Sequence, residues 1–169
     1  IAKGYGIDRI GEYMASQGIT DYLIELGGEI LARGINIDKE SPWVAGIETV
    51  DSELNSRGFE AAVNLTDIAM AASGNYRKFR VDTATGKRYV HTLNPLTGSA
   101  ETSDVTSAAV LATTCAEADA YATAFMALGL QRSKALLEAL DGIEVYLTYT
   151  SADSTGVYIT EGFKPLLRD

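Results

Sequence analysis

The stretch YLIELGGEIL, residues 22–31, decides the fold. Two short apolar runs flank Gly27 and Gly28, a pattern that predicts a tight β-hairpin. Such a hairpin joins antiparallel strands, because parallel strands need a much longer crossover connection. Further strand-like runs, most of them separated by turn-rich segments, lie at residues 43–47, 59–65, 89–94, 105–112, 144–150 and 156–160.

Helical signals occur near the beginning of the chain and again late in it. Apolar residues recur at helical spacing from Ile7 to Met14, and Gly18 follows as a left-handed cap. Thr114, with glutamate three residues later, fits a capping box, which predicts a helix over 115–128. A further helix is expected over 133–140. The pattern is that of an α+β fold, a largely antiparallel sheet with helices packed on it.

Composition limits the classes of protein to consider. The 169 residues suit one ordinary domain, so we expect a single domain over 1–169. The net charge of -9 argues against nucleic-acid partners and against a polybasic membrane patch. Cys115 is the only cysteine, so an intrachain disulfide is excluded, and a small buried side chain is expected there.

Asp119 and Thr123 are four residues apart in the helix predicted over 115–128, so they share a face of it. Ala122 and Met126 make that side apolar, where a carboxylate is costly unless it is paired or bound to a metal. Carboxylate and hydroxyl oxygens suit a hard cation such as Mg²⁺. An exposed aspartate stabilised by the helix dipole is the equal alternative at this point.

The evidence for the other candidate site residues is weaker when each residue is considered alone. His91, the only histidine, suits a general base or a phosphate donor, or a structural role on a sheet face. Lys3, at or just before the first helix, suits anion binding or is a solvated charge. Ser73 and Gly74 offer a hydroxyl and a flexible backbone near a strand end, where an ordinary turn is the alternative.

Taken in order, the motifs resemble the C-terminal portion of the FAD:protein FMN transferase (ApbE) family. The resemblance covers nearly the whole chain, and the ordered set of motifs is specific although each one alone is weak. The matching landmarks are residues 2–5 with Asp8, 27–29 with Gly34, 42–43, 73–76, 86–89, 91–98, 105–106 and 118–124. The N-terminal portion of such proteins has no counterpart in these residues.

The resemblance implies an enzyme that cleaves FAD at its pyrophosphate, passes FMN to a threonine or serine hydroxyl of a target flavoprotein and releases AMP. A divalent cation, usually Mg²⁺, bridges phosphate oxygens in such chemistry. By the family's motifs, Asp119 and Thr123 help hold that metal. Lys3 and His91 line the site of the flavin nucleotide. His91 contacts the phosphates or assists proton removal from the acceptor.

The resemblance also assigns Ser73 and Gly74 to the nucleotide cleft. Asn75 and Asn94 stand where the family commonly has aspartate, which leaves two alternatives: FAD hydrolysis to FMN and AMP, or flavin binding without turnover. The family recognises roughly Asp-x-x-Ser/Thr-Gly-Ala-Thr/Ser in its targets, and this chain has no such motif. Many relatives are periplasmic lipoproteins, so we expect periplasmic location, with any lipid anchor outside this chain.

Overall fold

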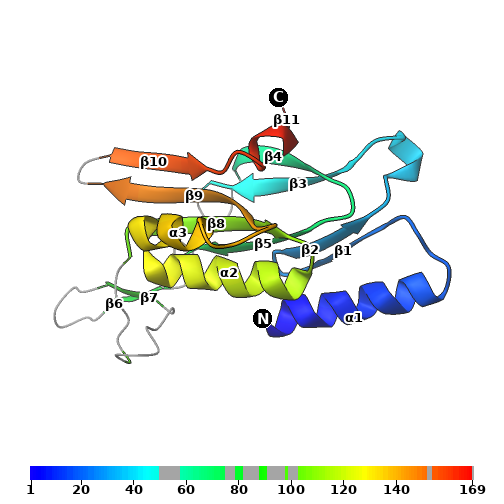
Figure 1. Ribbon diagram of the computed structural model, residues 1–169, viewed down its shortest axis with the longest axis horizontal. Coiled ribbons are helices and arrows are strands. Elements are labelled where there is room, and N and C mark those ends of the chain that lie inside the picture. Colours follow the sequence, from blue (N-terminus) through cyan, green and yellow to red (C-terminus); the bar gives the residue numbers. More distant parts are fainter. Residues whose placement is uncertain are drawn as a thin grey trace.

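The computed structural model describes residues 1–49, 58–74, 79–81, 88–90, 98, 103–151 and 154–168. Its largest element is a six-stranded sheet in the order β1-β2-β5-β8-β9-β10, in which all neighbouring strands are antiparallel (Figure 1). These strands are β1 (Tyr22–Leu26), β2 (Glu29–Arg33), β5 (Ala69–Gly74), β8 (Val105–Ala112), β9 (Glu144–Ser151) and β10 (Ser154–Ile159).

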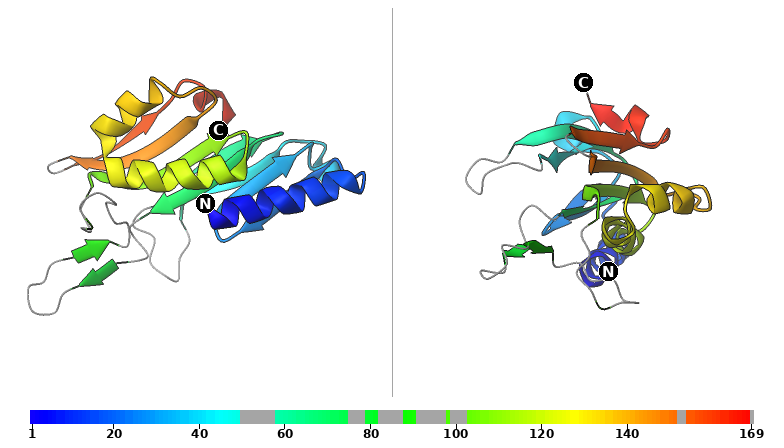
Figure 2. Two further views of the ribbon diagram at one scale, coloured as in Figure 1. Left: turned by 60° about the horizontal axis from the view of Figure 1, so that its bottom comes forward. Right: turned by 90° about the vertical axis from the view of Figure 1, so that its left-hand side faces the viewer.

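Two different layers cover the faces of this sheet, as the views in Figure 2 show. One face carries the helices α1 (Ala2–Ser16), α2 (Cys115–Leu128) and α3 (Leu130–Leu137). The other packs against a three-stranded sheet of β3 (Trp43–Glu48), β4 (Phe59–Leu65) and β11 (Leu167–Arg168).

The short elements are the 3₁₀ turns Ile37–Lys39 and Lys164–Leu166 and a separate antiparallel pair, β6 (Phe79–Val81) with β7 (Arg88–Val90). None of the helices in the described ranges combines the length and the hydropathy that crossing a membrane requires.

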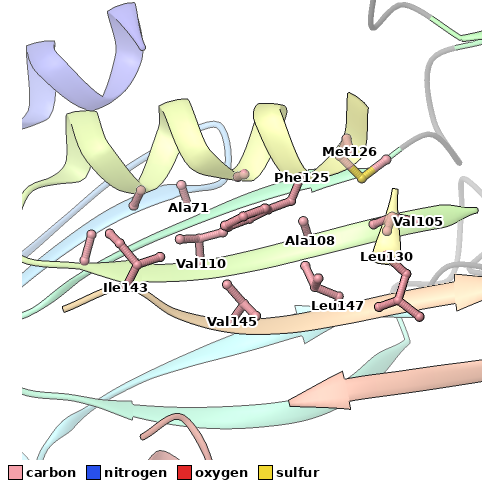
Figure 3. Packing of buried hydrophobic residues seen from close by; sticks show 13 residues of the cluster. Ala71, Val105, Ala108, Val110, Phe125, Met126, Leu130, Ile143, Val145 and Leu147 are labelled. Carbon is pink, nitrogen blue, oxygen red and sulfur yellow. The ribbon is translucent and has the colours of Figure 1, made fainter. Parts of the chain in front are cut away.

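The central strand β8 is buried on both faces, which explains its nearly continuous apolar sequence. Ala108 and Val110 face the helices, where the buried ring of Phe125 from α2 packs over them (Figure 3). The intervening Ala109 and Leu111 point to the opposite face and pack against the three-stranded sheet. The alternation follows from the two-residue period of a strand.

The predicted α+β architecture is confirmed. The hairpin at 22–31 forms as β1 and β2, with Gly27 (φ 60°) and Gly28 (φ 100°) both in the left-handed region that this tight turn requires. Thr114 caps α2 as predicted, because its Oγ1 accepts a hydrogen bond from the Glu117 N–H, while its hydroxyl donates to the Glu117 carboxylate.

The first helix begins at Ala2, so Lys3 lies inside its first turn. The third helix differs from the prediction at both ends, since it spans Leu130–Leu137 rather than 133–140. The Asp104 carboxylate accepts the Leu130 N–H at 2.8 Å and so satisfies a backbone donor at the start of that helix.

The beginnings of α1 and α2 meet on the same face of the sheet (Figure 1). Gly4 makes this approach possible, because a Cβ there would lie 2.3 Å from the carbonyl oxygen of Cys115. Asp8 then caps α2, since its carboxylate oxygens accept the Cys115 N–H at 2.8 Å and the Ala116 N–H at 2.9 Å. The junction sets the first turn of α1 beside the first turns of α2.

Replacing Gly4 tests this junction. Gly4→Ala places a methyl group against the backbone of α2 and is expected to lower the free energy of unfolding by about 1–3 kcal/mol. Gly6→Ala is the matched control, because a Cβ at Gly6 meets no atom within 4 Å. Helix propensity alone makes that change stabilising, by up to about 1 kcal/mol. Urea unfolding measures both, and equal stabilisation by the two substitutions would contradict the close approach.

Candidate functional site

A cavity of about 560 Å³ lies where β2 begins, β5 ends and β8 begins. Its walls come from the first turn of α1, the β1–β2 hairpin, β3, β5, β8 and α2. At this end of the sheet the strands carry polar or very small residues, among them Ser73, Gly74 and Ser107. The apolar core therefore gives way to a polar hollow between the two helices and the second sheet.

The cavity brings together every predicted site residue that lies in the described part of the chain. Lys3 comes from α1, Ser73 and Gly74 come from the end of β5, and Asp119 and Thr123 come from α2. His91 lies outside the described residues, so its predicted part in the site stays a prediction.

Asp119 is buried, with 6% of its surface exposed, so the alternative of an exposed aspartate is wrong. Its Oδ2 accepts the Gly4 N–H at 3.0 Å. Burial works to raise the pKa of Asp119, whereas the hydrogen bond from Gly4 and the positive charge of Lys3 work to lower it. Thr123, one turn later, lines the same cavity.

Lys3 is held against the β1–β2 hairpin. Its Nζ donates to the carbonyl oxygen of Gly27 at 3.1 Å and forms an ion pair with Glu29. Half of the Lys3 side chain is exposed, whereas Glu29 is almost fully buried. Burial raises the pKa of Glu29, and the charge of Asp119 adds to the rise, although Lys3 opposes it. Glu29 is a member of the site to which the sequence assigned no role.

The sequence held two signals for Glu29: it belongs to the landmark at 27–29, and it is a carboxylate at the start of a strand that is otherwise mostly apolar. Ser107 was missed as well. It is buried beside the cavity, and its Oγ has no hydrogen-bond partner among the described residues. A hydroxyl within an apolar strand such as β8 is the local sign that this part of the strand faces a polar hollow.

The charge of the cavity is predominantly negative. Four carboxylates line it, those of Glu25, Glu29, Glu48 and Asp119, and Lys3 is the only basic residue among the lining residues that the structure describes. A phosphate group entering this cavity meets net repulsion unless a cation accompanies it.

The donor set at Asp119 suits a hard cation. No group of three or more histidine, cysteine, aspartate or glutamate side chains suited to a metal occurs among the described residues. A cation here would therefore have few protein ligands, the Asp119 carboxylate and the Thr123 hydroxyl. That is the situation typical of Mg²⁺, which keeps several waters and shares substrate phosphate oxygens.

The fold and this cavity define the class of protein: the chain belongs to the ApbE family, whose model matches residues 1–147. It is 38% identical over 168 residues to the FAD:protein FMN transferase of Vibrio cholerae, a match that covers 99% of this chain and 48% of that protein. The structure of the flavin transferase ApbE from Vibrio cholerae superposes with a TM-score of 0.82 and 38% identity, covering 98% of this chain and 50% of that one.

The ApbE protein from Thermotoga maritima gives the same TM-score, 0.82, at 28% identity, covering 100% of this chain and 52% of that one. The chain thus spans about half the length of the relatives it matches. Membership of the family agrees with the resemblance found in the motifs.

Glu29 generates a prediction about pH. Because its pKa is raised above the usual 4.5 in the folded state, the folded protein binds more protons than the unfolded chain as pH rises past 4.5. The contribution of Glu29 to the free energy of unfolding therefore decreases as the pH rises from 4.5 to the pKa of Glu29 in the folded protein. Urea unfolding of the wild type and of Glu29→Gln across this range should show the variant gaining relative stability as pH rises. A relative loss would mean that the ion pair with Lys3 dominates over burial.

Proposed function

We propose that the protein, at its full natural length, is a Mg²⁺-dependent FAD:protein FMN transferase. It cleaves the pyrophosphate of FAD, joins FMN through a phosphoester bond to a threonine or serine of a target flavoprotein and releases AMP. The proposal extends to this chain the activity named for its relatives from Vibrio cholerae and Haemophilus influenzae.

One observation carries the proposal: a buried carboxylate, a hydroxyl one helical turn later and a lysine line a single cavity. Asp119 and Thr123 supply oxygen ligands from one face of α2, and Lys3 supplies a positive charge from α1. The remaining carboxylates around the cavity would repel a pyrophosphate alone, which supports a requirement for the cation.

In the proposed mechanism, Asp119 and Thr123 would hold the cation, which when bound offsets the charge that develops on the phosphate oxygens. Lys3 donates a hydrogen bond to a phosphate oxygen of FAD. The acceptor hydroxyl attacks the phosphorus of the FMN half and loses its proton, while the bond from that phosphorus to the bridging oxygen breaks and AMP leaves with that oxygen. His91 is proposed to take the hydroxyl proton or to contact the phosphates.

The acceptor is proposed to be a flavoprotein that carries the family's target motif around a threonine or serine. Ser73 and Gly74, at the end of β5 beside the β1–β2 hairpin, are proposed to line the nucleotide cleft. A periplasmic location and a lipid anchor outside this chain stay predictions from the resemblance.

The test combines the full-length protein with FAD, Mg²⁺ and an acceptor domain that carries the target motif. Intact mass should show an acceptor heavier by one FMN, and chromatography should show an equal amount of AMP. Asp119→Asn should lower kcat/KM by at least about a hundredfold, because the cation loses its charged ligand. Thr123→Val should lower it by about tenfold, whereas Thr123→Ser, the matched control, keeps the oxygen and most of the activity.

The products separate the alternatives. AMP without a heavier acceptor would mean hydrolysis of FAD in place of transfer. FAD binding without any AMP would mean a flavin-binding protein. A wild-type rate in Asp119→Asn would contradict the assigned cation site even if transfer occurs.

A further inference from the structure

We propose that Glu29 is a positioning residue, which fixes the ammonium group of Lys3 at the mouth of the cavity for one phosphate oxygen of the substrate. The inference deepens the proposed function and rests on it. It concerns a residue that does not itself touch the substrate and that acts through Lys3.

The contacts of Lys3 support this role. A lysine ammonium has three N–H donors. The carbonyl oxygen of Gly27 and the carboxylate of Glu29 engage the ammonium from neighbouring positions of the β1–β2 hairpin. The described residues offer the ammonium no further acceptor, which leaves its third donor for a ligand in the cavity that Lys3 lines. The ammonium lies close against the turn of the hairpin, since a Cβ on Gly27 would be in van der Waals contact with Nζ at 3.6 Å.

The energetics of Glu29 also favour a positioning role over a stabilising one. Glu29 is 3% exposed and lies opposite Ala71 in the sheet. Removing a carboxylate from water is costly, and a buried ion pair seldom adds net stability over a neutral pair of similar shape. The pair does restrict Lys3, whose flexible four-carbon stem is half exposed and would otherwise sample many rotamers.

Glu29 also separates the charges of the site. Of the two buried carboxylates beside the cavity, Glu29 forms the ion pair with Lys3, whereas Asp119 accepts the Gly4 N–H. Lys3 influences Asp119 through its charge alone. By engaging Lys3, Glu29 leaves the Asp119 carboxylate available to a cation while it holds a positive charge nearby.

A double-mutant cycle in the full-length protein tests the coupling. The proteins are the wild type, Lys3→Met, Glu29→Gln and the double variant. KM and kcat for FAD are measured with acceptor and Mg²⁺ saturating, and the Kd for FAD is measured by flavin fluorescence. Glu161→Gln is the matched control, because it removes the carboxylate of an exposed Glu–Lys pair with Lys164, away from the cavity.

Glu29→Gln should raise KM and Kd for FAD by about tenfold, the effect of losing one charge-assisted contact, with kcat within about twofold. In the Lys3→Met background the same substitution should change Kd by less than about twofold, because the residue through which Glu29 acts is gone. Glu161→Gln should leave both constants unchanged. If Glu29 had only a structural role, Glu29→Gln would lower the melting temperature, and its effect on the Kd for FAD would be the same with and without Lys3.

Three results would overturn the inference: an unchanged Kd in Glu29→Gln, an unchanged Kd in Lys3→Met, or equal increases from Glu29→Gln in both backgrounds. If the wild type binds FAD but transfers nothing, the proposed function fails. The Kd values of the four proteins in the double-mutant cycle still decide the role of Glu29. If the wild type does not bind FAD at all, both proposals fail.

Discussion

The carboxylate of Asp8 makes the contact on which the site depends. It satisfies two of the backbone N–H groups that the beginning of α2 leaves without an intrahelical partner. Together with the close approach at Gly4, it fixes α1 against α2. Lys3 and Asp119 belong to different helices, so their relative position is set by this junction. The chemistry proposed for the cavity therefore rests on a helix cap outside it.

The same strands build both the core and the site. Along β5 and β8, Ala71 and Val110 pack beneath the helices, whereas Ser73 and Ser107 line the cavity near the strand ends. A rigid sheet that continues into a polar hollow holds its polar groups more precisely than a mobile loop does. The cost is an accumulation of carboxylates such as Glu29, which is why the proposed phosphate ligand would need an accompanying cation.

Local signals made much of the fold predictable. The Gly27–Gly28 turn and the capping box at Thr114 each act within a few residues, so the sequence alone reveals them. The apolar helix face made Asp119 a candidate, and the family resemblance assigned it to the metal. Contacts between distant segments were not predictable: the bond from Cys115 to Asp8 spans 107 residues, and the partner of Glu29 lies in another element. The roles of Asp8 and Glu29 could be assigned only from the assembled structure.

The central claim is that an acidic cavity beside Lys3 takes the pyrophosphate of FAD only together with a cation held at Asp119. Calorimetric titration of FAD into the full-length protein, in Mg²⁺ and again in EDTA, tests it most directly. The account predicts binding at least about tenfold tighter with Mg²⁺, and reciprocally tighter Mg²⁺ binding with FAD, with both effects lost in Asp119→Asn. Equal FAD affinity in Mg²⁺ and in EDTA would contradict it.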